Sequence, residues 1–314
     1  MYSLNKVGEK TYYIDCPTNI GLYKLNDTDV CIIDSSNDKE AGRKINKILK
    51  ENNFNLKYII NTHSNADHIG GNEFLQKRTE CKIISTEIEN LFTKYPILEP
   101  SFLYGAYPFN KLTNKFLMAK ASNPTGNLDE LPEGLEYIKL GGHFFDMIGI
   151  KTSDDVYFLA DCVFGENIVK KYHISFIYNV DEFLKTLDYV ENLEGKLFIP
   201  SHAEACEDIK PLVKLNRDKV YEIIDTILSI CKEPLIFEDI LQKLFIHYDL
   251  TMDLNQYVLI GNTLKAYLSY LYDIEKLNIE FIIYRIQFLF VLIKLLISKK
   301  IDVFLIKTFM VTLP

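Results

Sequence analysis

The sequence contains no tryptophan, and among its 314 residues there are only 14 glycines, 10 prolines and six cysteines. It shows none of the strong compositional biases of disordered, collagen-like or disulfide-scaffold chains. The six cysteines lie far apart and form no CxxC pair. Because residues 1–10 do not resemble a signal peptide, we expect reduced, mostly buried thiols in a cytoplasmic protein.

Basic residues are also in the minority, with 35 Lys and Arg against 43 Asp and Glu and a formal net charge of −8. This balance argues against a general nucleic-acid binder, although local basic patches are still allowed. The charge is unevenly distributed, because residues 281–314 carry a net charge of +4 and leave −12 for the first 280 residues. The last tenth of the chain therefore differs from the rest in the sign of its net charge.

The length is sufficient for about two domains, and 48% hydrophobic residues indicate a globular protein with a sizeable core. Short β-like runs, TYYID, IGLYKL and VCIID, precede an amphipathic helix near residues 39–52 and the apolar strand KYIINT. A second set, LEYIKL, FFDMIGI and VYFLA, precedes a helix over residues 180–193 and the strand KLFIP. We therefore predict two sheets with helices on their outer faces over residues 1–208.

Residues 86–131 are less regular, and we interpret them as a helical insert that either walls a pocket or packs on the surface. Residues 209–280 read as three helices followed by the start of a strand, which resembles a winged-helix module. Acidic residues are interspersed among these helices, so we expect a packing or dimerisation module that helps frame the pocket, with a homodimer as one option. Binding to duplex nucleic acid is not favoured.

The segment 281–314 is apolar and basic, and its status stays open. The run IQFLFVLIKLLI is too short, and too interrupted by Arg285 before it and Lys294 within it, for a membrane span. Basic amphipathic helices before and after Lys299, contacting a membrane surface or a partner, are one interpretation. Another is a segment foreign to the rest of the chain, such as the product of a shifted reading frame in an AT-rich gene.

Chemistry-bearing residues gather at the ends of the predicted strands. His63, Asp67 and His68 follow KYIINT directly, and three further candidates occur at or after apolar strands: His143, Asp161 and His202. Imidazole and carboxylate groups are good ligands for zinc and iron. Because loops at strand ends can present side chains toward one point, we predict a single metal centre. His173 and His247 are expected to be ordinary residues, and Cys162 to pack in the core.

These motifs resemble the metallo-β-lactamase superfamily, whose pattern is HxHxDH, then a His after Gly, an Asp after an apolar strand and a final His. The resemblance covers residues 1–208, includes Asp34 at the end of an early strand, and implies an αββα sandwich. One position departs from the pattern, because the second motif His is Asn65 here.

Carried over residue by residue, the resemblance implies two metal positions that share Asp161 as a bridge. The first is bound by His63, Asn65 and His143, and the second by Asp67, His68 and His202. An amide oxygen is a weaker zinc ligand than imidazole. We therefore expect two unequal sites, unless Asn65 is instead a turn residue that hydrogen-bonds the backbone.

The function that the resemblance implies is a metal-dependent hydrolase, with one or two zinc ions, acting on a small ester, thioester, lactone or phosphoester. Hydroxide formed from metal-bound water would attack the substrate, and Asp67 and Asp161 would orient that water. A mononuclear iron oxidoreductase similar to the persulfide dioxygenases, using His63, His143 and Asp161, is an alternative. A non-catalytic binding protein on the same fold is another, because of Asn65.

Overall fold

The computed structural model describes residues 2–285 and 305–312, with the backbone alone for 281–285 and 305–312. The first sheet has six strands in the spatial order β1 to β6. Each of its first four strands is antiparallel to its neighbour among them, and β4, β5 and β6 run parallel. The strands are β1 (Ser3–Lys6), β2 (Thr11–Asp15), β3 (Ile20–Lys24), β4 (Asp29–Ile33), β5 (Asn55–Ile60) and β6 (Lys82–Ile84).

The second sheet has the order β10, β9, β8, β7, and only the pair β10 and β9 is parallel. Its strands are β7 (Leu135–Lys139), β8 (Ile148–Thr152), β9 (Val156–Phe164) and β10 (Leu197–His202). The strand predicted at FFDMIGI is wrong in its first half, because β8 begins only at Ile148. The preceding residues form a loop closed by a hydrogen bond from Leu140 N to Met147 O, and Asp146 N donates to the Glu89 side chain instead of to a strand.

Two helices cover the outer face of the first sheet, α1 (Lys39–Glu51) and α3 (Asn72–Thr79). Helix α1 is capped by Asp38, whose carboxylate accepts from the N–H groups of Glu40 and Ala41. Its apolar side chains recur at helical spacing and pack with α3 against the sheet: Ala41, Ile45, Ile48 and Leu49 are buried.

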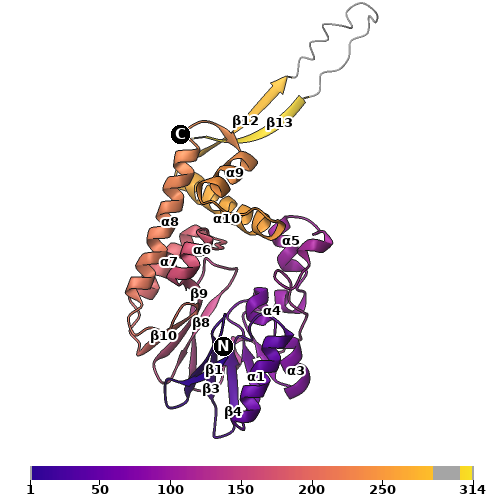
Figure 1. Cartoon of the computed structure of the whole chain (residues 1–314), viewed down its shortest axis with the longest axis vertical. Coiled ribbons are helices and arrows are strands. Elements are labelled where there is room, and N and C mark those ends of the chain that lie inside the picture. Colours follow the sequence, from indigo (N-terminus) through magenta and orange to yellow (C-terminus); the bar gives the residue numbers. More distant parts are fainter. Residues whose placement is uncertain (1, 286–304, 313–314) are drawn as a thin grey trace, which may run out of the picture.

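The two sheets pack face to face through a shared apolar layer, which includes Ile33, Ile60, Ile148 and Phe158. Helices α7 (Val180–Glu191) and α8 (Lys210–Ile230) cover the outer face of the second sheet (Figure 1). The predicted αββα sandwich is therefore confirmed, with a helical region following it. A short helix that the sequence did not suggest, α6 (Glu166–Tyr172), lies between β9 and α7.

The insert between β6 and β7 is helical, as predicted. It contains α4 (Glu87–Lys94), α5 (Leu98–Tyr104) and two short 3-10 helices, Asn110–Leu112 and Leu128–Glu130. Leu103, Leu112 and Leu117 of this insert are buried together with Val258, which lies in the C-terminal helical region. The insert therefore extends from the first sheet to helix α10 (Leu254–Asp273) (Figure 1).

The C-terminal region runs helix, strand, helix, helix, strand, strand. Its elements are α8, β11 (Leu235–Ile236), α9 (Phe237–His247), α10 (Leu254–Asp273), β12 (Asn278–Arg285) and β13 (Leu305–Thr312). The winged-helix assignment and the boundary at residue 208 stay predictions. Buried side chains on both sides of that boundary, such as Phe183, Val213 and Tyr267, belong to one apolar cluster.

The interpretation of the segment after Lys299 as a basic amphipathic helix is wrong where the structure describes the chain. Residues 305–312 form β13, which pairs antiparallel with β12 and with β11. Strand-favouring residues such as Ile306, Phe309 and Val311 account for this. Strand β12 runs through the predicted limit at residue 281, and the segment 286–304 lies outside the described residues. Among the helices in the described part of the chain, none has the length and apolar content needed to cross a membrane.

Candidate metal centre

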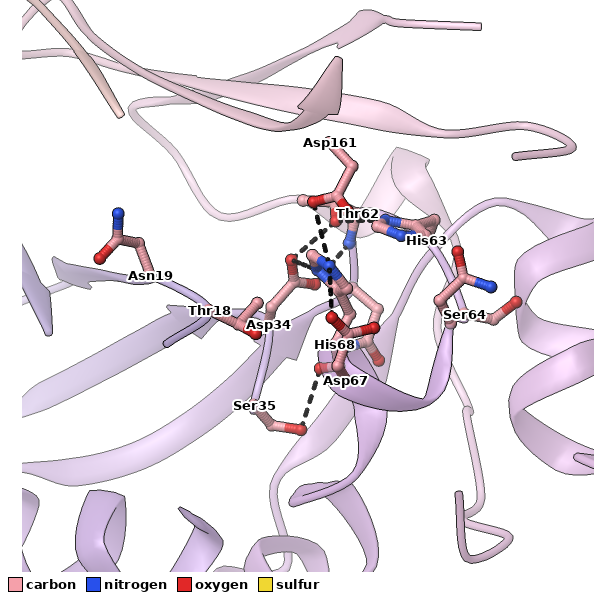
Figure 2. A network of polar contacts seen from close by, with 12 residues as sticks. Thr18, Asn19, Asp34, Ser35, Thr62, His63, Ser64, Asp67, His68 and Asp161 are labelled. Atoms are coloured by element: carbon pink, nitrogen blue, oxygen red, sulfur yellow. Dashed lines mark hydrogen bonds and ion pairs between the residues drawn. The ribbon is translucent and has the colours of Figure 1, made fainter. Parts of the chain in front are cut away.

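The centre lies where four chain segments converge: the segment that follows β5, the loop that carries His143, strand β9 and the end of β10. Figure 2 shows His63, Asp67 and His68 of the first segment beside Asp161 of β9. His63 follows β5, and the next residues open the short helix α2 (Ala66–Ile69), which carries Asp67 and His68. Asp161 lies within β9 directly after Ala160, whose φ of 51° is unusual for a residue with a side chain. The register between β9 and β10 shifts between Pro200 and His202, and such bulges commonly re-aim side chains near active sites.

A glycine shapes the loop that carries His143. Gly142 has a φ of 109°, and a Cβ there would lie 2.3 Å from the backbone of Phe183 in α7. Only glycine fits this close approach. Gly141 needs no such freedom, since the nearest atom to its added Cβ is 3.8 Å away and its φ is not positive.

Asp161 lies at the middle of the cluster and is only 4% exposed. Its Oδ1 is 3.1 Å from His68 Nε2, and its Oδ2 is 3.2 Å from His202 Nε2 and 3.6 Å from His143 Nε2. The Asp67 carboxylate is 3.2 Å from His202 Nε2. The predicted residues His63, Asn65, Asp67, His68, His143, Asp161 and His202 therefore meet at one place.

Each of the four imidazoles is anchored through its Nδ1 atom. The acceptors are Thr62 Oγ1 for His63, Asp34 Oδ2 for His68, the Phe176 carbonyl for His143 and the Pro17 carbonyl for His202. An imidazole that donates from Nδ1 presents the lone pair of Nε2 when it is neutral. This is the usual arrangement of metal-ligating histidines, in which an outer partner fixes the tautomer and orientation of the ring.

Asp34 holds the segment that carries His63 and His68 at two points, Thr62 and His68. It is 1% exposed, its Oδ1 accepts from Thr62 N at 2.8 Å, and its Oδ2 accepts from Thr62 Oγ1 at 2.7 Å and from His68 Nδ1 at 2.8 Å. Since the Thr62 hydroxyl proton goes to Asp34, the Thr62 oxygen is free to accept from His63. In Figure 2 the His68 ring lies between Asp34 and Asp161.

The donor atoms fit a metal ion. His63 Nε2, His68 Nε2 and Asp161 Oδ1 are buried without a hydrogen-bond partner of suitable geometry. Buried polar atoms rarely lack partners, so these three require another kind of ligand or a bound water. Ligand atoms of His63, His68 and Asp161 lie within 4.8 Å of one another, and so do those of Asp67, His68 and His202. Nitrogen and carboxylate donors in such groups suit zinc or iron.

Burial and neighbouring charges act together on the pKa values of the cluster. Burial lowers the pKa values of His63 and His143 and so favours their neutral forms. Burial acts in the same direction on His68, but the carboxylates of Asp161, Asp67 and Asp34 raise its pKa well above the usual range. The pKa of Asp161 is held well below its usual range by His202 and His68, against the opposing effect of burial. A cation is therefore favoured between these carboxylates.

Asn65 does not act as a simple turn residue. It is the N-cap residue of α2, but its side chain makes no capping hydrogen bond to the backbone. Its Nδ2 donates to Glu99 Oε1 at 2.8 Å, and its Oδ1 lies 3.1 Å from His143 Nε2. The side chain is therefore directed into the centre.

Three supporting residues were not predicted from the sequence: Thr62, Glu89 and Glu99. Glu89 is fully buried and accepts from Ser64 N, Ser64 Oγ and Asp146 N, so it joins the His63 loop to the His143 loop. Its pKa is raised to about 7, chiefly by burial. Acidic residues of a helix usually face solvent, but Glu89 lies three and four residues before Phe92 and Thr93 and so shares their buried face of α4. That periodicity was the available signal.

The remaining candidates have ordinary positions, as expected. His173 stacks on Tyr248, with ring centroids 5.1 Å apart, and its Nδ1 lies 3.3 Å from Lys219 Nζ. His247 lies on α9, and Cys162 is fully buried in the core. The six cysteines form no disulfide, and all but Cys206 are buried.

A cavity of about 520 Å³ opens onto the centre. Asp67, His143, Asp161 and His202 line its polar end. Its walls are largely apolar and include Leu103, Leu117, Phe164, Ile174, Phe176, Leu259 and Ile260. Among the described residues that line it, Lys115 is the only lysine or arginine, and its Nζ lies 2.8 Å from Asp38 Oδ2. Both the insert and α10 therefore help to form the cavity.

Comparisons with solved structures support the fold beyond the sandwich. A beta-lactamase domain protein from Burkholderia ambifaria aligns over 88% of this chain and 90% of its own, with a TM-score of 0.66 and 14% identity. A metallo-beta-lactamase family protein from Thermus thermophilus aligns over 84% of this chain and 91% of its own, with a TM-score of 0.64 and 15% identity. Coverage this large extends past residue 208 into the helical region.

Sequence comparison gives the family. A hydroxyacylglutathione hydrolase from Pelagibacter ubique (strain HTCC1062) is 41% identical over 54 residues, which are 17% of this chain and 21% of that protein. The chain thus matches only about a fifth of the length of this relative. The family model described as "Metallo-beta-lactamase superfamily" matches residues 13–202, more than half of the chain. With the sandwich and the convergent His and Asp cluster already in place, this match shows that the chain belongs to the metallo-β-lactamase superfamily.

Proposed function

We propose that this protein is a metal-dependent hydrolase that uses zinc and acts on a carboxylic ester, thioester or lactone with an apolar acyl group. The observation that carries the proposal is the combination of four Nδ1-anchored imidazoles and two carboxylates at the polar end of a largely apolar cavity. Membership of the superfamily and the short match to a hydroxyacylglutathione hydrolase favour hydrolysis over other chemistry.

The side chains of the centre divide the work. His63, Asn65, His143 and Asp161 would hold one ion, and Asp67, His68, His202 and Asp161 a second. Bound zinc would supply a nucleophile at neutral pH and polarise the substrate carbonyl. Asp67 has a 40% exposed side chain that borders the cavity, so it can hold a water or accept a proton near the substrate. Asp161 is buried and directs its two oxygens to different imidazoles, which suits a fixed bridging role.

The cavity walls support the choice of substrate. A phosphoester or nucleic acid carries negative charge that is normally met by Lys or Arg. Lys115 is the only Lys or Arg among the described residues that line the cavity, and it is already paired with Asp38. The exposed face of α8 adds Asp218, Glu222 and Asp225, which do not favour nucleic acid either. Apolar walls instead favour a small substrate with an uncharged acyl chain. Cytoplasmic location, a homodimer, a winged-helix fold for the C-terminal region and membrane contact by the tail stay predictions.

Metal analysis and a substrate panel test the proposal. Protein purified without added metal should contain zinc, and it should cleave p-nitrophenyl acyl esters, acyl thioesters or lactones faster than bis-p-nitrophenyl phosphate. Asp67→Ala should abolish this activity, while Asp27→Ala in an exposed turn should not. Iron without zinc would support the dioxygenase alternative, and activity that persists in Asp67→Ala would contradict the catalytic centre.

The contribution of the apolar wall can be tested separately. Leu259→Phe in α10 should reduce cleavage of long acyl chains while leaving short esters as substrates, because the larger ring narrows the cavity. Ile246→Phe, at a 72% exposed position on α9, is the control. An unchanged chain-length profile in Leu259→Phe would show that the acyl group binds elsewhere.

A further inference from the structure

The residue that departs from the superfamily pattern has an unusual partner. Asn65 lies between His143 and Glu99, with Oδ1 3.1 Å from His143 Nε2 and Nδ2 2.8 Å from Glu99 Oε1. Glu99 belongs to α5 of the insert and is only 5% exposed. A buried carboxyl group costs free energy unless it is paired, so its place beside Asn65 calls for an explanation.

The hydrogen bond decides which end of the amide faces the centre. An Asn side chain has a donor end and an acceptor end of nearly equal shape, and only its partners distinguish them. A carboxyl oxygen of Glu99 accepts from Nδ2 whether or not the other oxygen carries a proton. The amide nitrogen is therefore held toward Glu99, and the carbonyl oxygen is turned toward His143.

The geometry on the opposite side fits a shared cation. His143 donates from Nδ1 to the Phe176 carbonyl at 2.9 Å, so neutral His143 presents the Nε2 lone pair to Asn65 Oδ1. Two lone pairs facing each other at 3.1 Å repel unless a cation, either a proton or a metal ion, lies between them. Two tetrahedral zinc ligands with bonds of about 2.0–2.1 Å lie about 3.3 Å apart, close to the observed separation.

We infer that Glu99 is a positioning residue that holds the Asn65 amide with its carbonyl oxygen toward the metal centre, so that Asn65 can take the place of the missing imidazole ligand. The inference rests on the proposed function in one respect, that the centre binds metal. Glu99 also accepts a hydrogen bond from the amide nitrogen. This bond polarises the amide and strengthens its carbonyl oxygen as a metal ligand. Outer partners of this kind typically contribute 10- to 100-fold to metal affinity.

A double-mutant cycle on zinc affinity tests the inference without an activity assay. Zinc is titrated by calorimetry, with a competing chelator, into Asn65→Ala, Glu99→Met, the double variant and the unaltered protein. Glu99→Met fills a similar volume without an acceptor, Glu99→Gln keeps an acceptor oxygen, and Glu87→Ala removes an exposed acid of α4 as a control. Circular dichroism checks that each variant folds.

The expected result is a loss of about 10- to 100-fold at the weaker zinc site in Glu99→Met, with the tighter site unchanged. Glu99→Gln should lose much less affinity, and Glu99→Met should have no further effect once Asn65 is Ala. The positioning role would be overturned if Glu99→Met caused no loss of zinc affinity, or an equal loss with and without Asn65→Ala. It would also be overturned if the protein bound a single zinc ion whose affinity did not change in Asn65→Ala. If the unaltered protein binds no zinc, the proposed function fails first, and the two failures are thereby distinguished.

Discussion

Asp34→Asn is the substitution that tests the support of the centre most directly. The Asp34 carboxylate accepts three hydrogen bonds at 2.7–2.8 Å in a 1% exposed environment. Asparagine has one acceptor oxygen, which can keep the bond from Thr62 N. Its amide nitrogen then faces Thr62 Oγ1 and His68 Nδ1. The threonine hydroxyl can rotate to accept, but the imidazole N–H cannot.

The size of the effect of Asp34→Asn depends on which nitrogen of His68 carries the proton in the variant. If His68 keeps its Nδ1 proton, an unpaired buried donor costs about 1–3 kcal/mol of unfolding free energy. If the proton moves to Nε2, stability is largely kept, but Nε2 is lost as a metal ligand, and the zinc affinity falls at least 10- to 100-fold. We therefore expect a loss in stability, in zinc affinity or in both, whichever tautomer the variant adopts.

Two measurements separate these outcomes. Urea denaturation of metal-free protein gives the change in unfolding free energy, and zinc titration against a chelator gives the affinity. Asp27→Asn, which removes one charge from an exposed turn, is the control and should change neither. An Asp34→Asn protein with unchanged stability and zinc affinity within twofold of the unaltered protein would refute the role assigned to Asp34.

Three further predictions concern the supports of the centre. The pKa of Glu89 is raised to about 7, so ionisation of this group opposes folding. The free energy of unfolding should therefore fall by about 3 kcal/mol as the pH rises from about 4.5 to 7. Glu89→Gln should lack this component when urea denaturation is repeated across that range, and an identical pH profile would contradict the assignment. Gly142→Ala should lower the unfolding free energy by at least about 2 kcal/mol because its Cβ meets the Phe183 backbone, whereas Gly141→Ala should have little effect. Zinc at about 100 times its dissociation constant should add about 2.7 kcal/mol of stability, measured by denaturation with and without a chelator, and Asp161→Asn should abolish most of that gain.

Much of the sandwich followed from local sequence. Alternating and apolar runs predicted most of its strands, and the spacing of Ala41, Ile45 and Leu49 predicted α1. The first half of the strand predicted over residues 144–150 and the interpretation of a helix after Lys299 were wrong where the structure describes the chain. In both cases the apolar run did not specify what the backbone would pair with, because the partner is distant in sequence. Residues 305–312 pair with β12, whereas Asp146 N donates to the Glu89 side chain instead of to a strand.

The sequence by itself also determined the ligand types and their order, because His63, Asp67, His68, His143, Asp161 and His202 are spaced along the chain in a recognisable pattern. Only the tertiary structure decided which atoms face one another. Glu89 and Glu99 act on loops up to 57 and 34 residues away, and the carbonyls of Pro17 and Phe176 carry no side-chain signature. Hydrogen bonds of this kind depend on backbone positions that packing sets, so a one-dimensional pattern identifies the ligands but leaves their support undetermined.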